Sequence, residues 1–135
     1  MPTLQIKLSN TSRLFFIFAC LLGATGVALG AYASHGLSVW ASIEQIEYFQ
    51  LAVTYQLVHA LTLFAVCILS LFISSYFLLA SKIAFASGIL LFSGSLYLYV
   101  LTGTKILGML TPIGGLLLII AWTLVAVSLL TYRNN

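Results

Sequence analysis

Residues 48–72, YFQLAVTYQLVHALTLFAVCILSLF, decide the fold of this chain, because they form a long apolar run without a charged side chain. A helix rises about 1.5 Å per residue, so about 20 apolar residues cross the hydrocarbon core of a bilayer. The run therefore predicts a transmembrane helix. Gln56 and His59 lie one helical turn apart inside it. Polar side chains are costly at membrane depth, so both need partners or a function.

The composition of the whole chain agrees with this interpretation. Of its 135 residues, 62% are hydrophobic and only 5% are charged, too few charges to cover a soluble domain of this size. The length leaves room for about four or five spans and excludes a large soluble catalytic domain. The five basic residues are scattered singly, so the net positive charge does not indicate nucleic-acid binding.

Apolar runs on both sides of residues 48–72 complete the expected architecture. We expect an all-α integral membrane four-helix bundle with short loops, a single domain over residues 1–135. Its spans are expected at about residues 14–33, 48–72, 80–101 and 113–131. The first run is longer than the apolar region of a signal peptide, so it is expected to be retained. Residues 38–47 are expected to form a short interfacial helix, and Lys82 to extend toward the near interface.

The charges predict the orientation of the bundle. If both termini lie on one side, that side carries four basic residues, Lys7, Arg13, Lys82 and Arg133. The other side carries Lys105 and both acidic residues, Glu44 and Glu47. Basic residues concentrate on the cytoplasmic side of membrane proteins. The sequence therefore predicts that the N-terminus and the C-terminus are both cytoplasmic.

Polar residues of the four spans are expected to meet near the middle of the membrane. Counted along its helix, His59 lies roughly 16 Å below the outer edge of the bilayer. The expected central polar layer consists of Tyr55, Gln56, His59, Ser93, Ser95 and Trp122. We expect His59 to find hydrogen-bond partners on its own helix or among the two serines. The layer is then either an interhelical cluster that fixes helix register or a relay or binding site.

A second group of polar residues falls at the outer ends of the helices. It consists of His35, Glu44, Glu47, Lys105 and Thr111. The group is expected to form a polar cap on the helix ends; a metal site at His35 is the alternative. No paired histidines and no HExxH motif accompany it, so we expect no metal and no cofactor. A single haem bridging His35 and His59 is disfavoured, because their depths differ by on the order of 15 Å.

Small residues predict where helices approach one another closely. Gly26, Gly30 and Ser34 recur at every fourth position of the first span, a pattern typical of helix packing in membranes. The full set of expected packing glycines is Gly23, Gly26, Gly30, Gly88, Gly94, Gly114 and Gly115.

Four sequence segments resemble the signature segments of one known family. They are LGAYASHGL at 29–37, YQLVHAL at 55–61, LFSGSLY at 91–97 and TPIGGLLLIIAW at 111–122. In order and spacing they are similar to the YgdD-like family, also called domain of unknown function 423, with eukaryotic relatives called transmembrane protein 256. The family pattern falls on Gly30, Ala31, His35, Tyr55, Gln56, His59, Ser93, Gly94, Ser95, Tyr97, Thr111, Pro112, Gly114, Gly115 and Trp122.

The chain departs from the family pattern at two places. Ala33-Ser34 stands where Gly-Ala is usual, and Ala121 stands where glycine usually precedes the tryptophan. These residues are still small, so only a role that needs the backbone freedom of glycine is in doubt. The resemblance implies a multi-pass protein with four spans in the bacterial inner membrane. It implies no reaction, because none is established for the family.

Three classes of function follow from the sequence. The chain holds no complete catalytic constellation, so we expect a structural or partner-binding membrane component and not an enzyme. Its expected partners are the lipid bilayer and either a second copy or another membrane protein. The alternative is a small-solute or proton-coupled transporter that acts as an oligomer, although Glu44 and Glu47 lie outside the spans. A membrane enzyme built on the outer group is the third class, without a recognisable motif.

Overall fold

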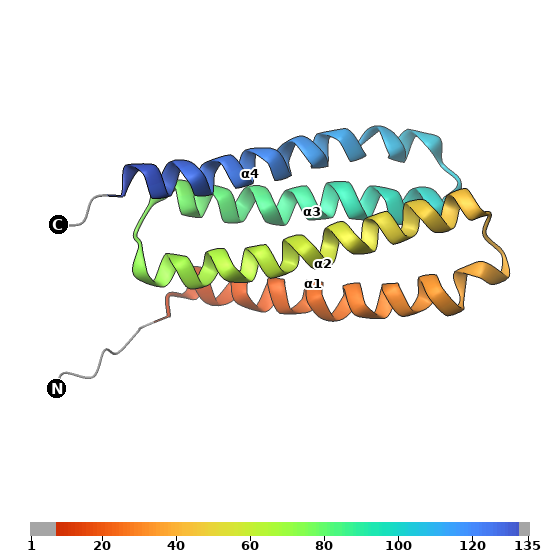
Figure 1. Cartoon of the computed structure of the whole chain (residues 1–135), viewed down its shortest axis with the longest axis horizontal. Coiled ribbons are helices and arrows are strands. Elements are labelled where there is room, and N and C mark those ends of the chain that lie inside the picture. The colour runs from red at the N-terminus through yellow and green to blue at the C-terminus, as the bar shows by residue number, and fades with distance from the viewer. Residues whose placement is uncertain (1–7, 133–135) are drawn as a thin grey trace.

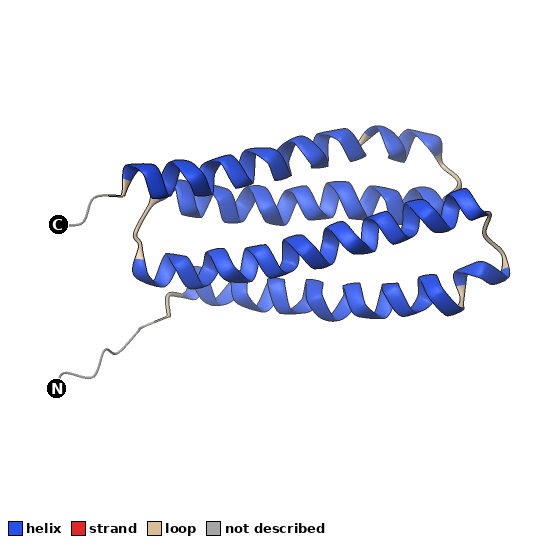
Figure 2. Cartoon of the chain, viewed as in Figure 1, coloured by secondary structure: helices blue, strands red, loops and turns tan. Residues whose placement is uncertain are grey.

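Four long helices, joined by short connections, make up the fold (Figures 1 and 2). The computed structural model describes residues 8–132. The helices are α1 (Asn10–His35), α2 (Ile43–Phe72), α3 (Tyr76–Thr102) and α4 (Thr111–Thr131). The connections include short 3-10 helices, η1 (Leu37–Val39) and η2 (Lys105–Met109). Each long helix has the length and the apolar composition to cross a membrane. The prediction of an all-α four-helix membrane bundle is therefore confirmed.

Serine residues set where three of the helices begin. The side chains of Ser9 and Ser75 accept hydrogen bonds from backbone amides in the first turns of α1 and α3. Ser42 forms a reciprocal capping box with Gln45 at the start of α2. Such caps satisfy amide groups that have no partner within the helix. At the other end of α3, Gly103 adopts a left-handed conformation with φ of 69°, which glycine adopts without steric cost.

The segment before α2 differs from the expectation. Residues 38–47 were predicted to form a separate interfacial helix, but α2 already begins at Ile43. The capping box at Ser42 starts the helix there, so Glu44 and Glu47 belong to the first two turns of α2. Trp40 remains in the connection, where its indole N–H donates to the hydroxyl of Tyr32 at 3.1 Å. The prediction of a separate helix was therefore wrong.

The helices pack in the order of the chain, α1 on α2, α2 on α3 and α3 on α4. Nine residues of α2 and eleven of α3 are buried, against four each in α1 and α4, so α2 and α3 are the inner helices of the bundle. We call the end where α1 begins and α4 ends the proximal end, and the opposite end, where α2 begins, the distal end (Figure 1). The three-residue turn Ile73–Ser75 connects α2 to α3 at the proximal end.

Two apolar clusters fill the interior. The larger one lies toward the proximal end and takes residues from all four helices, among them Ala19, Leu63, Phe85 and Leu118. The smaller one lies toward the distal end and joins α1, η1, α2 and α3 around Phe49. The outward faces are also apolar, with Leu61 and Ile119 each more than half exposed. A water-exposed surface does not carry so much apolar area, so these faces are suited to lipid.

Glycines allow the close approach of several helix pairs. A Cβ atom placed on Gly26 or Gly30 of α1 would meet side chains of α2, and one on Gly88 would meet Leu118 of α4. A Cβ on Gly114 would overlap the backbone of α3 at Leu91 and Phe92. At Gly115 the contact would be an ordinary one, 3.6 Å from the ring of Phe92. Gly23 and Gly94 have no atom of another helix nearby. A Cβ atom would fit at these two positions, so neither glycine is needed there for a close approach of helices.

The orientation of this bundle in the membrane is open to a direct test. Arg13 and Lys82 lie toward the proximal end and Lys105 at the distal end, whereas Lys7 and Arg133 lie outside the described residues. We expect the proximal end to face the cytoplasm. In a chain with Cys20 and Cys67 replaced by alanine, Ser38→Cys and Lys105→Cys should react with an impermeant maleimide on intact cells. Ser74→Cys should react only after permeabilisation. Labelling of Lys105→Cys and Ser74→Cys from the same side would contradict the arrangement.

Candidate functional site

Gln56 joins three helices at the centre of the bundle. Its amide nitrogen donates to the backbone oxygen of Leu22 at 2.8 Å and to the hydroxyl of Thr25 at 2.9 Å, both on α1. Its amide oxygen accepts a hydrogen bond from the hydroxyl of Tyr97 on α3 at 2.8 Å. The side chain is only 4% exposed, and both polar ends of the amide are satisfied. Gln56 therefore connects α1 to α3 through α2.

The two serines of the expected layer connect other pairs of helices. Ser93 of α3 donates to the backbone oxygen of Ala52 on α2 at 2.7 Å. The hydroxyls of Ser95 and Thr111 are 2.7 Å apart and join α3 to the first turn of α4. Buried hydroxyl groups need hydrogen bonds of this kind, because no water is available to them in the hydrocarbon core. Gln56, Ser93 and Ser95 together fit the interhelical interpretation of the layer.

His59 has a different environment from the rest of the layer. Its Nδ1 lies 2.7 Å from the backbone oxygen of Tyr55, one turn earlier in α2. A carbonyl oxygen accepts and does not donate, so Nδ1 carries the proton in this bond. The ring stacks beside Tyr55 and meets the edge of Trp122 from α4, with ring centroids 5.5 and 6.5 Å apart. Backbone and aromatic contacts thus fix the orientation of the imidazole.

The second ring nitrogen of His59, Nε2, has no hydrogen-bond partner among the described residues. The side chain is 8% exposed and lines a cavity of about 440 Å³ between α2 and α4. Among the described residues, Ser128 Oγ is the one fully enclosed polar side-chain atom without a hydrogen-bond partner. Nε2 of His59 also lacks a partner but is not fully enclosed, so it is accessible from the cavity. With the proton on Nδ1, Nε2 of the neutral ring is a hydrogen-bond acceptor.

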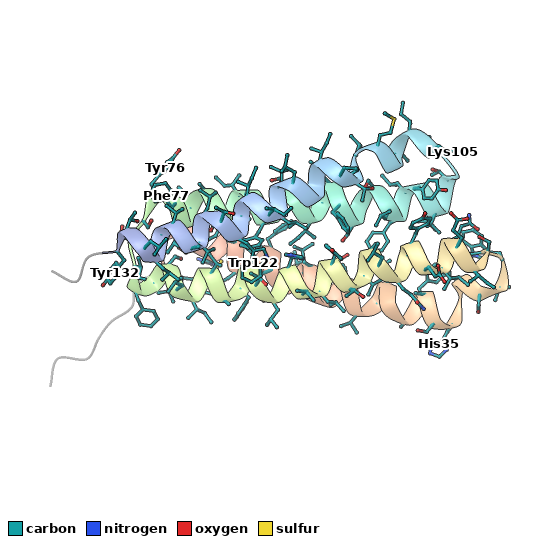
Figure 3. All side chains as sticks on the ribbon, turned by 45° about the horizontal axis from the view of Figure 1, so that its top comes forward. His35, Tyr76, Phe77, Lys105, Trp122 and Tyr132 are labelled. Carbon is teal, nitrogen blue, oxygen red and sulfur yellow. The ribbon has the colours of Figure 1, made fainter. Side chains whose placement is uncertain are left out.

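The cavity at His59 is part of a longer groove. We use α2–α4 groove for the depression between these two helices, with α3 as its floor. Toward the distal end the groove continues past Phe92 into a second cavity of about 560 Å³, whose lining includes Tyr48, Tyr99 and Lys105. Toward the proximal end it continues past Trp122 into a smaller apolar depression of about 300 Å³. Figure 3 shows Trp122 midway along the bundle and Lys105 at its distal end.

The depths of the expected layer need a correction. Ser93 and Ser95 were expected level with His59, but Ser93 is level with Ala52 and Ser95 with Thr111. Ala52 lies seven residues from His59, roughly 10 Å along the helix axis. The cause is the tight turn Ile73–Ser75, after which α3 begins at Tyr76 and not near residue 80. His59 instead lies level with Phe85 and Trp122.

The outer polar group does not come together. His35, Glu44, Glu47 and Lys105 are all exposed at the distal end. Figure 3 shows His35 and Lys105 on opposite sides of the bundle, because α1 packs on α2 whereas η2 packs on α3 and α4. Thr111 bonds to Ser95 and not to the other members. Over residues 8–132, no three His, Cys, Asp or Glu side chains are grouped so that they could hold a metal ion.

Three residues that form buried polar contacts in the structure were not among the candidate site residues predicted from the sequence. Thr25 and Tyr97 complete the bonding of Gln56. Lys82 is 4% exposed and donates to Ser70, whereas we expected it to extend to the interface. Tyr97 was named from the sequence only as part of the family pattern. For the other two a sequence signal exists, since Lys82 is a lone charge in an apolar run and Thr25 a lone hydroxyl at mid-span. Intramembrane groups of this kind are functional candidates on general grounds.

Comparison with known proteins places the chain in a family. Residues 29–115 match the family described as "Protein of unknown function (DUF423)". The chain belongs to this family. The matched region of this DUF423 member contains Gln56, His59 and Gly114. No solved structure matches the chain.

Several membrane proteins of this family are similar over almost their full length. A UPF0382 membrane protein of Staphylococcus aureus is 40% identical, over 86% of this chain and 94% of its own. The UPF0382 membrane protein YwdK of Bacillus subtilis is 36% identical, over 89% and 98%. The UPF0382 inner membrane protein YgdD of Escherichia coli is 32% identical, over 93% and 95%. These names agree with the four apolar helices, and the DUF423 member described here is a multi-pass membrane protein.

Proposed function

We propose that this protein is a binding component of the membrane, not an enzyme, and that its site is the α2–α4 groove at His59. The proposed ligand is a membrane-dissolved apolar molecule that carries a hydroxyl group. Its hydroxyl donates to Nε2 of His59, and its apolar part lies along the groove. The α2–α4 groove opens to the side of the bundle, so such a ligand enters from the lipid phase.

One observation carries the proposal, the oriented Nε2 of His59, which has no hydrogen-bond partner among the described residues and lies in a mostly apolar cavity. The bond from Nδ1 to the carbonyl of Tyr55 holds the ring in place, and the aromatic side chains of Phe92 and Trp122 line the same cavity. Cavities of about 300–1,000 Å³ with mostly apolar walls and few polar groups are typical small-molecule sites. A buried acceptor without a donor is costly in hydrocarbon, and a hydroxyl group removes that cost.

The dimensions of the groove favour a small amphiphile over a protein segment. The cavity at His59 brings an imidazole together with the aromatic side chains of Phe92 and Trp122, and the second cavity beyond Phe92 offers room for an apolar chain. A docked helix would need a long, continuous groove, whereas the depression beyond Trp122 is the smallest of the three, with a volume of about 300 Å³. A second copy of the chain is therefore the less favoured occupant.

A transporter that acts as an oligomer was the alternative from the sequence. Between His59 and the proximal end, the buried residues of α2 are Ala60, Leu63, Val66 and Cys67. A polar solute crossing one copy of the bundle along α2 would have to pass these apolar side chains. The contacts of His59 therefore support binding within the membrane more strongly than passage through the bundle.

The proposal can be tested with two probes that differ in a single donor. In a Trp40→Phe background, Trp122 is the remaining tryptophan and borders the cavity, so its fluorescence reports binding in detergent. We expect 4-octylphenol to bind about tenfold more tightly than 4-octylanisole, in which a methyl group replaces the hydroxyl hydrogen.

Two histidine variants serve as the test and the control. His59→Phe keeps a flat ring but removes Nε2, so it should bind both probes with the weaker affinity. His35→Phe changes the exposed histidine at the end of α1 and should keep the preference for the phenol. A preference that survives in His59→Phe would refute the proposal. Failure of the parent to bind either probe would also refute it.

A further inference from the structure

A second site lies at the proximal end of the bundle, around Lys82. The side chain of this lysine is 4% exposed, although it lies only six residues into α3, roughly 9 Å from its start. The two carboxylate side chains of the chain, Glu44 and Glu47, are at the distal end. A buried cation is costly unless an anion or several acceptors compensate it. Lys82 has no carboxylate side chain to compensate it.

The contacts of Lys82 leave much of its charge without compensation. The ammonium donates to the hydroxyl of Ser70 at 3.2 Å and lies 5.4 Å from the ring centre of Phe15. An ammonium group has three donors, and one of them has a hydrogen-bond acceptor among the described residues. A neutral hydroxyl and an aromatic face attract a cation, but neither carries a negative charge.

A polar cavity of about 360 Å³ lies beside this lysine. Six serine and threonine hydroxyl groups line it, from Ser9, Thr11, Ser12, Ser70, Ser74 and Ser75. Ser9 and Ser75 are the N-caps of α1 and α3, so two helices begin at this cavity. The N-terminus of a helix carries a partial positive charge and free amide groups, which favour anions. The hydroxyls of Ser9 and Ser70 already donate to Ser12 and Cys67, so the donors for one anion are the lysine, the other hydroxyls and the remaining amides of the helix ends.

From these contacts we propose that this cavity binds a phosphate group, with Lys82 as its charged ligand. The shared chemistry is a tetrahedral oxyanion, carried either by a phospholipid headgroup or by free phosphate. Tyr76 and Tyr132 lie at the same end of the bundle (Figure 3), and tyrosines concentrate at the headgroup level of a bilayer. The site goes beyond the α2–α4 groove proposed above and does not depend on it.

A purely structural role for Lys82 makes a different prediction. The last turn of α2 ends nearby at Phe72, and its carbonyl groups attract a cation. In that case the lysine would be satisfied within the bundle, and its removal would not change the binding of an anion. Anion binding therefore separates the two roles, whereas a change in stability alone does not.

The experiment uses the full chain in a nonionic detergent and two probes. Native mass spectrometry measures the binding of phosphatidylglycerol, with diacylglycerol as the phosphate-free control. Thermal unfolding in sodium phosphate, compared with sodium chloride at equal ionic strength, measures the binding of free phosphate. We expect the parent to bind one phosphatidylglycerol, and Lys82→Met to bind it at least about tenfold more weakly. His35→Phe, a change of an exposed side chain at the distal end outside both proposed sites, should bind as the parent does.

Two further variants keep the test independent of folding. Lys82→Arg retains the charge and should retain binding. Ser74→Ala removes an exposed hydroxyl at the rim of the cavity and should weaken binding by a few fold without affecting the core. If phosphate stabilises the parent and displaces the lipid, the ligand is free phosphate. If the lipid binds and phosphate does not displace it, the ligand is the phospholipid headgroup. Equal binding by the parent and Lys82→Met, or no binding of either probe to the parent, would overturn the proposal.

Discussion

Replacing Gly114 with alanine should destabilise the bundle by about 3 kcal/mol, the upper end of the range for overpacking. The added methyl group would lie 2.7 Å from the α-carbon of Phe92 and 2.8 Å from the carbonyl carbon of Leu91. These are backbone atoms of α3, which cannot rotate out of the way as a side chain does. Relief therefore requires α4 to move away from α3, with loss of packing along the interface. Unfolding in mixed micelles with increasing dodecyl sulfate measures the change.

The neighbouring glycine provides the matched control. A Cβ at Gly115 would touch the ring of Phe92 at 3.6 and 3.7 Å, which is ordinary van der Waals contact. We expect Gly115→Ala to change the free energy of unfolding by no more than about 0.5 kcal/mol. Equal stability of the two variants would show that α4 does not approach α3 as closely as described.

Replacing Gln56 with leucine should have the second largest effect on stability, a loss of about 2 kcal/mol. The substitution keeps the approximate size of the side chain but removes three hydrogen bonds, to Leu22, Thr25 and Tyr97. Intramembrane hydrogen bonds contribute about 0.6 kcal/mol on average and up to about 1.7. The buried hydroxyl of Tyr97 also loses its partner, which adds to the cost.

A double-mutant cycle separates this bonding from packing. Tyr97→Phe removes the hydroxyl that donates to Gln56, so the double variant should be less destabilised than the sum of the two single changes. Thr54→Val is a suitable control, because Thr54 bonds only within its own helix and is exposed. Strict additivity of the Gln56 and Tyr97 changes would contradict a direct bond between these side chains.

The architecture could be predicted from sequence because its causes are local. A run such as residues 48–72 is long and apolar enough to span a bilayer whatever surrounds it. Pro112 lies in the first turn of α4, where proline is tolerated. The start of α2 was misplaced because the capping box at Ser42 extends the helix beyond the apolar run. Propensity and hydropathy thus predicted the elements better than their ends.

The candidate site could be predicted only in part, because it depends on the relative positions of the helices. Gln56 and His59 were identified as polar residues at depth. The turn Ile73–Ser75, however, places Ser93 about 10 Å from the level of His59. The α2–α4 groove exists because these two helices both pack on α3 and little on each other, which no periodicity in the sequence indicates. The burial of Lys82 likewise depends on contacts with Ser70 and Phe15 from two other helices.

The state of the imidazole nitrogens of His59 tests the central claim most directly. Nitrogen NMR of the protein with ¹⁵N-labelled histidine, assigned with His35→Phe, distinguishes a protonated ring nitrogen from an unprotonated one. In the neutral ring we predict that His59 carries its proton on Nδ1, and that 4-octylphenol shifts the Nε2 signal whereas 4-octylanisole does not. A proton on Nε2 in the free protein, or an Nε2 signal that does not respond to the phenol, would contradict the account.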